Sequence, residues 1–183
     1  DLHKEYRRQR QMCIRDSKMT DRMAGLVVLN DREGEERDVA LSDFYDNYRD
    51  DAIVIDKWLS LQATSSRLDT LDQVKRLMDH RVFSIKQPNK VRALISAFCA
   101  SNPYRFHDPD GSGYRFLTDR ILQLDPINPQ IAARLAVQLG RWRGYDNNRG
   151  SLMQKELSRI LATKDLSIDV FEIASKSLGE GAP

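Results

Sequence analysis

The stretch QPNKVRALISAFCASNPYRFHDPDGSGY, from Gln87 to Tyr114, decides the fold. Its first half places four apolar residues at the i, i+3, i+4, i+7 spacing of one helical face: Val91, Leu94, Ile95 and Phe98. Its second half holds two turn-forming sequences, Asn102-Pro103 and Asp108-Pro109-Asp110-Gly111. The stretch therefore predicts an amphipathic helix over 89–101, a short join, and a further helix from residue 112.

Apolar residues recur at the same helical spacing from Lys18 to the end of the chain, and no alternating run of apolar and polar residues indicates a strand. This pattern predicts an all-α body. The expected helices span about 20–30, 41–50, 51–63, 70–79, 89–101, 112–123, 129–143, 147–163 and 167–178.

The joins between these helices are short and rich in Pro, Asn, Asp and Gly. Short joins force successive helices to lie antiparallel. Helix hairpins of about 40 residues per pair indicate stacked antiparallel helix pairs, an α-solenoid of the HEAT or armadillo kind. Side-chain caps are expected at three residues that can accept from exposed backbone N–H groups, Ser42, Thr70 and Asn128, the last followed by a proline at the first helical position.

Length and charge restrict the class of protein. With 183 residues and 40% hydrophobic content the chain can form one core, and a single helical domain over 18–183 is the simplest arrangement. Residues 1–17 hold five Lys/Arg and three Asp/Glu, which leaves 24 of each sign in 18–183. The balanced body gives no reason to expect nucleic acid or a membrane as partner. Since the longest apolar stretches are too short for a membrane span and no signal-peptide core is present, a cytoplasmic location is expected.

Residues 1–17, DLHKEYRRQRQMCIRDS, differ from the rest of the chain because they carry no helical apolar stripe. The string MCIRDS, from Met12 to Ser17, resembles a translated transposon end from a sequencing library. The segment is therefore predicted to be a non-native or disordered segment. A genuine basic arm is the alternative.

Thiol chemistry is not expected. The two cysteines, Cys13 and Cys99, have no His or Cys neighbour at a metal-ligand spacing. Cys99 lies in the apolar run ALISAFCAS, where a buried and inert thiol is expected rather than a reactive one.

Three parts of the sequence together resemble one known family: residues 87–114, LSDFYDNYRDDAIVIDKWLSLQAT at 41–64, and NPQIAARLAVQLGRWRGYD at 128–146. The family is the bacterial zinc aminopeptidases of the aminopeptidase N (alanyl aminopeptidase) type, and the part resembled is their C-terminal helical domain. The resemblance covers nearly everything from Lys18 onward. It implies helix pairs stacked into a superhelical bowl, with the catalytic domain of the same polypeptide and peptide substrates as partners.

The metal-binding motifs of that family are not found in this sequence. They are a His-Glu-x-x-His helix with a further Glu as third zinc ligand, and a Gly-x-Met-Glu-Asn loop that grips the amino terminus of the substrate. The three histidines, His3, His80 and His107, include no pair four residues apart, as two ligands on one helical face must be. Zinc is thus expected only in the parent enzyme, and the chain alone is predicted to hold no catalytic residue or cofactor. His80 is expected to cap a helix end as a cation, and His107 to lie in a loop.

The segment from Asp108 to Asp119 offers a calcium loop as an alternative site. Its oxygen donors and glycine stand at positions 1, 3, 5, 12 and 6 of the EF-hand spacing. Arg115 occupies position 8, where an aliphatic residue normally pairs with a second loop, and the sequence has no second loop. The same residues also fit a turn followed by a helix capped by Ser112.

Two arginines are the candidate functional residues. The helix over 89–101 leaves Arg92 on a flank of its apolar stripe, with Ser96 and Cys99. The helix over 129–143 groups three residues on a face away from its apolar side: Arg134, Gln138 and Arg141. Arginine suits a site for a carboxylate or peptide carbonyls, because its planar fork donates two parallel hydrogen bonds. The resemblance implies that Arg92, in NKVR, and Arg134, in IAAR, line the substrate cavity; a surface or ion-pairing role is the alternative.

The sequence thus predicts the C-terminal domain of a zinc aminopeptidase that removes N-terminal residues from peptides. As the resemblance implies, this part would cover the active site and line the substrate cavity, and alone it would hydrolyse nothing. The alternative function is that of a free-standing α-solenoid that binds a protein partner.

Overall fold

The computed structural model describes residues 19–179, and every regular element in that range is helical. In chain order the elements are α2 (Met19–Leu29), α3 (Glu35–Tyr48), α4 (Ala52–Ala63), α5 (Thr70–Met78), α6 (Pro88–Val91), the π-helical turn η1 (Arg92–Ser96), α7 (Ala97–Ser101), α8 (Pro103–Phe106), α9 (Ser112–Leu124), α10 (Pro129–Ala136), the 3₁₀ turn η2 (Leu139–Gly144), α11 (Asn147–Leu161) and α12 (Ile168–Leu178). The prediction about residues 1–17 falls outside this range.

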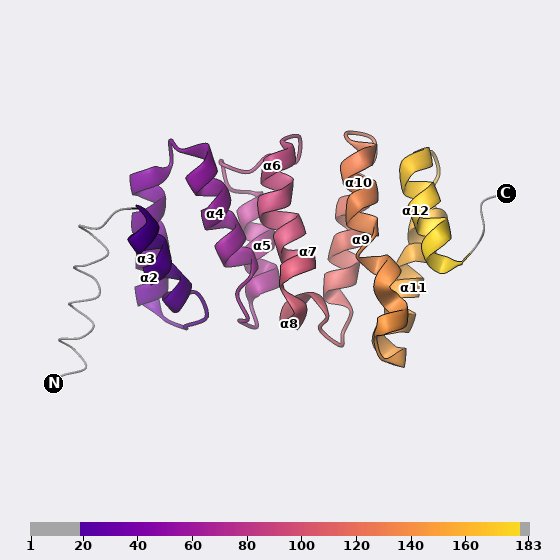
Figure 1. The fold of residues 1–183 in the computed structure, drawn as a ribbon, viewed down its shortest axis with the longest axis horizontal. Coiled ribbons are helices and arrows are strands. Elements are labelled where there is room, and N and C mark those ends of the chain that lie inside the picture. The colour runs from indigo at the N-terminus through magenta and orange to yellow at the C-terminus, as the bar shows by residue number, and fades with distance from the viewer. Residues whose placement is uncertain (1–18, 180–183) are drawn as a thin grey trace.

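The helices stand side by side along the long axis of the molecule, from α2 and α3 at one end to α12 at the other (Figure 1). Two polar contacts fix the direction of α4 against α6 and α7. The Lys90 ammonium pairs with Asp56 at 2.6 Å, and the Asn102 amide donates to the carbonyl of Ala63 at 3.0 Å. The first pair joins the N-terminal halves of the two helices, and the second joins their C-terminal ends. Helix α4 therefore runs parallel to the continuous helix formed by α6, η1 and α7.

Helices α10 and α12 also run parallel to each other. Before the two helices, the backbone N–H of Ser167 donates to Asp125 at 2.9 Å; beyond the end of α10, the Trp142 indole donates to the carbonyl of Ser177 at 2.9 Å. These parallel helices form one layer, and α5 and α9 recede behind it in Figure 1. An all-α solenoid of stacked helix pairs, as predicted, is confirmed.

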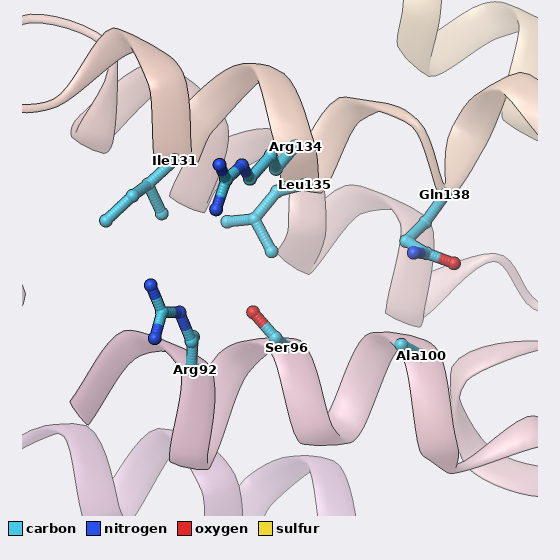
Figure 2. Close-up of a pocket in the computed structure, with 7 residues that line it drawn as sticks. All are labelled: Arg92, Ser96, Ala100, Ile131, Arg134, Leu135 and Gln138. Atoms are coloured by element: carbon cyan, nitrogen blue, oxygen red, sulfur yellow. The ribbon is translucent and has the colours of Figure 1, made fainter. Parts of the chain in front are cut away.

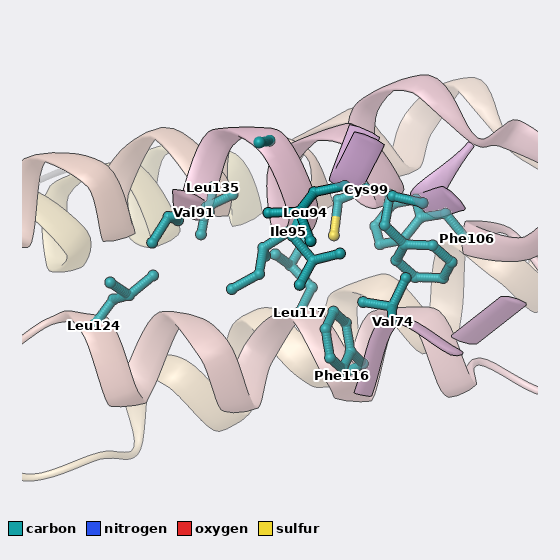
Figure 3. Packing of buried hydrophobic residues seen from close by; sticks show 14 of the residues in the cluster. Val74, Val91, Leu94, Ile95, Cys99, Phe106, Phe116, Leu117, Leu124 and Leu135 are labelled. Atoms are coloured by element: carbon teal, nitrogen blue, oxygen red, sulfur yellow. The ribbon is translucent and has the colours of Figure 1, made fainter. Parts of the chain in front are cut away.

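Large apolar side chains from both layers fill the core (Figure 3). The predicted stripe of Val91, Leu94, Ile95 and Phe98 is fully buried, which confirms the face assigned to this helix. Phe98 meets Phe116 of α9 edge-on, with ring centroids 5.7 Å apart. Because each buried side chain of this size stabilises the fold by about 1.5–3 kcal/mol, the stripe fixes the helix against α9.

Two helices differ most in their bounds from the prediction, and the short helix α8 was not predicted. Helix α3 was expected to begin at residue 41 and begins at Glu35, because acidic residues in its first turn interact favourably with the N-terminal end of a helix. The helix expected over 129–143 is α-helical only to Ala136 and continues as the 3₁₀ turn η2.

Only one of the predicted caps is confirmed: the Asn128 side chain accepts from the N–H of Ile131 at 3.2 Å, with Pro129 opening α10. The other cap predictions are wrong. Ser42 lies inside α3, the Thr70 hydroxyl donates to the carbonyl of Ser65, and α9 has no side-chain cap, because Gly111 precedes it with φ of 71°. Only glycine readily adopts that left-handed conformation.

His80 is not the capping cation that the sequence predicts. Its ring packs edge-on against Tyr45 with centroids 5.0 Å apart and lies 5.8 Å from the Trp58 ring. Burial, and then the neighbouring Arg81 guanidinium, lower the pKa of His80, so the neutral imidazole is favoured. Within residues 19–179, no helix has the length and apolar character needed to cross a membrane.

Candidate functional site

A shallow pocket of about 70 Å³ opens between η1–α7 and α10, the two neighbouring parallel helices at the middle of the layer (Figure 2). It is lined by Arg92, Ser96, Ala100, Ile131, Arg134, Leu135 and Gln138. Arg92 reaches it from one helix and Arg134 from the other, so the two candidate arginines share one site.

The local sequence explains why each guanidinium stays in solvent. Arg92 follows the fully buried Val91 and precedes the buried Ala93, so the backbone is anchored while the long side chain lies at the surface. Arg134 is exposed in the same way between Ala133 and Leu135, both buried. Both guanidinium groups therefore lie at the rim of the pocket, while the neighbouring apolar residues of each helix are buried.

The electrostatics of this pair differ from those of the ion-paired arginines in the structure. Arg67 pairs with Asp69 at 2.9 Å, and Arg149 pairs with Asp146 at 2.6 Å. Among residues 19–179, by contrast, no carboxylate lies within ion-pairing distance of Arg92 or Arg134. Arg92 makes a long hydrogen bond to Asn89, at 3.4 Å. Two uncompensated cations at one pocket favour an anion or carbonyl oxygens between them.

The remaining pocket residues combine a polar rim with an apolar floor. Ser96 and Gln138 supply a hydroxyl and an amide, while Ile131 and Leu135 supply aliphatic surface. Pockets for whole small-molecule ligands begin at roughly 300 Å³, well above the volume here. The geometry suits one group of an extended ligand, such as a carboxylate or a peptide unit lying across the layer.

The sequence predicted two groups of residues, one on each helix. The structure places some members of both groups at the pocket and others away from it. Ser96 joins Arg92 at the pocket as grouped, but Cys99 turns into the core with 3% of its surface exposed. Gln138 joins Arg134, whereas Arg141 lies in η2, outside the pocket lining. Three lining residues were not predicted from the sequence: Ala100, Ile131 and Leu135. Ala100 lies eight positions beyond Arg92, a spacing that could have indicated it.

The residues of the proposed calcium loop form the turn and helix start instead. The Asp110 carboxylate accepts from the N–H of Ser112 at 2.7 Å, Asp108 pairs with Arg105 at 3.6 Å, and Asp119 pairs with Arg159 of α11. In the part of the chain that the structure describes, no three His, Cys, Asp or Glu side chains gather as metal ligands. The carboxylates of this segment are thus engaged with other groups of the chain.

The family and the relatives agree with the fold. A family model described as "Domain of unknown function (DUF3458_C) ARM repeats" matches residues 2–179. That match includes most of the segment 1–17 without deciding its origin. Aminopeptidase N of Caulobacter vibrioides is 45% identical over 161 residues, which are 88% of this chain and 19% of that protein. Aminopeptidase N of Escherichia coli K12 is 39% identical over 160 residues, 87% of this chain and 18% of that protein.

A solved structure extends the comparison to three dimensions. The crystal structure of Legionella pneumophila aminopeptidase A in complex with aspartic acid superposes with a TM-score of 0.90 at 35% identity. The alignment covers 98% of this chain and 21% of that one. The chain thus spans about a fifth of the length of the proteins it matches. It belongs to the DUF3458_C family of ARM-repeat domains and is homologous to the C-terminal helical domain of bacterial aminopeptidase N.

Proposed function

We propose that this chain works as part of a zinc aminopeptidase that removes N-terminal residues from peptides, where it covers the active site and lines the substrate cavity with Arg92 and Arg134. The proposal is supported by relatives named as aminopeptidases at 39% to 45% identity over most of this chain. The partners are then the catalytic domain of the same polypeptide and the peptide itself, in the cytoplasm.

The observation that carries the proposal is the pair of guanidinium groups at one pocket without a carboxylate partner among the described residues. An ion-paired arginine such as Arg149, which bonds Asp146, already has its donors engaged within the chain. Apart from the long bond of Arg92 to Asn89, the donors of both side chains are left for a ligand, and two planar forks can hold carbonyls or a carboxylate of a bound peptide.

The chemistry is divided between this chain and the rest of the polypeptide. Zinc in the catalytic domain would polarise the scissile carbonyl and activate water. The described residues of this chain offer no zinc ligand set, so no step of the reaction is assigned to them. Their part is to hold the peptide beyond the scissile bond, which orients the bond for attack.

Single substitutions of the arginines test this role in the full-length enzyme. Arg92→Ala and Arg134→Ala should each lower kcat/KM for long peptides about tenfold, since a charge-assisted hydrogen bond contributes about 1.5–3 kcal/mol. Hydrolysis of a single-residue reporter, which is too short to reach the pocket, should change far less. Arg76→Ala is the matched control, because Arg76 is exposed on α5 and bonds Gln73 on its own helix. Equal losses on both substrates would overturn the proposal.

A further inference from the structure

The hydroxyl of Ser60, near the end of α4, donates to the backbone carbonyl of Ala93 at 2.8 Å. This is a contact between neighbouring parallel helices, and it reaches the carbonyl of the residue next to Arg92. On the other side of Arg92, the buried ammonium of Lys90 pairs with Asp56, also from α4. Helix α4 therefore bonds to residues on both sides of Arg92, to the side chain of Lys90 and to the backbone of Ala93.

Ala93 lies in the π-helical turn η1, which explains why its carbonyl accepts a side-chain donor. In an α-helix the N–H of Ala97 would donate to this carbonyl, four residues back. Here the N–H of Ala97 donates to the carbonyls of Arg92 and Leu94 instead. The hydroxyl of Ser60 supplies a hydrogen bond in place of the one that the π turn removes.

The π turn also decides where Arg92 lies. Residues four apart on an α-helix drift by about 40° around its axis, so Arg92, Ser96 and Ala100 would spread over about 80°. The wider turn of a π-helix counteracts this drift over its own length. Arg92, Ser96 and Ala100 accordingly form a single row that faces α10 along the pocket (Figure 2).

We propose that Ser60 is a positioning residue for Arg92: its bond to the carbonyl of Ala93 stabilises the π turn, and the π turn aligns Arg92 with the pocket shared with Arg134. The assignment rests on the function proposed above. Ser60 itself does not line the pocket and acts only through the helix that carries Arg92.

The first test is made on this chain by NMR, with scalar couplings across hydrogen bonds. In the unmodified chain the N–H of Ala97 should couple to the carbonyl carbon of Arg92. In Ser60→Ala that coupling should move to the carbonyl carbon of Ala93, as the helix returns to the α register. Ser60→Thr, which keeps a hydroxyl, should retain the original coupling. An unchanged coupling in Ser60→Ala would overturn the assignment.

The second test is kinetic and separates this inference from the proposed function. In the full-length enzyme, Ser60→Ala should raise KM for long peptides about threefold with little change in kcat, and Ser60→Thr should restore it. In an Arg92→Ala background, adding Ser60→Ala should not raise KM for long peptides further, because Ser60 acts through Arg92. Thr64→Val is the control, since its hydroxyl bonds only carbonyls of α4 itself.

The outcomes are distinguishable. An unchanged kcat/KM for long peptides in Arg92→Ala would overturn the proposed function, and with it any effect of Ser60 on substrate. A lowered kcat/KM in Arg92→Ala beside an unchanged KM in Ser60→Ala would overturn the Ser60 assignment alone.

Discussion

His107 and Tyr145 stack face to face with ring centroids 4.2 Å apart, and the Nε2 atom of His107 bonds the Tyr145 hydroxyl at 2.8 Å. The Nδ1 atom of His107 bonds the Tyr114 hydroxyl at 2.9 Å. One imidazole thus ties the start of α9 to the join between η2 and α11. Burial, followed by the charges of Arg149 and Arg141, lowers the pKa of His107 to about 4.

The depressed pKa of His107 predicts a loss of stability on mild acidification. Between its ordinary pKa of 6.5 and about 4 the unfolded chain binds a proton that the folded chain does not, so the free energy of unfolding falls as pH decreases. Urea unfolding at pH 7 and pH 5 should show a smaller decrease for His107→Gln than for the unmodified chain. The pKa of His80 is also lowered, so the free energy of unfolding should still depend on pH in both the variant and the unmodified chain. An equal decrease in the free energy of unfolding for both proteins would show that His107 does not cause the loss of stability.

Gly113 is predicted to be intolerant of any side chain. A Cβ atom there would lie 2.2 Å from the backbone carbonyl oxygen of Phe106, and backbone cannot move aside as a flexible side chain can. Gly113→Ala should lower the free energy of unfolding by about 1–3 kcal/mol, as overpacking of a core typically does. Gly144→Ala is the control, because a Cβ at Gly144 meets nothing within 4 Å. Equal stabilities of the two variants would show that this contact does not constrain the fold.

Cys99 is predicted to be chemically inert in the folded chain. Only 3% of its surface is exposed, and burial raises the pKa of the Cys99 thiol far above its ordinary value. Since the thiolate is the nucleophile, iodoacetamide at pH 8 should leave Cys99 unmodified until urea unfolds the chain. Peptide mass spectrometry measures the modified fraction, and rapid labelling without urea would contradict the packing around this residue.

The segment from Asp108 to Asp119 is predicted to bind no calcium at millimolar concentration. Its carboxylates already have partners, namely Arg105, the N–H of Ser112, and Arg159. Calorimetric titration with Ca²⁺ should therefore release no heat beyond dilution. A saturable heat that Asp110→Asn removes would favour a calcium-dependent module instead.

Much of the fold follows from the sequence, because helical periodicity reports which face is buried. The stripe from Val91 to Phe98 is fully buried as predicted, and Asn128 caps α10 as predicted. The other caps were mistaken because a hydroxyl near a helix start can bond elsewhere, as Thr70 does to the carbonyl of Ser65. A competing tertiary acceptor leaves no trace in the local sequence.

The pocket could be predicted only in part. Arg92 and Arg134 were identified on separate helices, but their meeting depends on the parallel packing of α7 and α10, which no local pattern encodes. The π turn at Arg92 is equally hidden, because the stripe around it keeps an ordinary helical spacing. The hydroxyl proposed to stabilise it lies on another helix, on Ser60.

The proposed role in an aminopeptidase is tested most directly by the sequence of the source DNA immediately upstream of the codon for Lys18, read from a library without transposon ends. We expect an open frame that continues into a region encoding His-Glu-x-x-His, which would make this domain part of a zinc aminopeptidase and residues 1–17 non-native. A genuine start codon, or the same basic arm encoded in the genome, would contradict it and favour a free-standing α-solenoid that binds a protein partner.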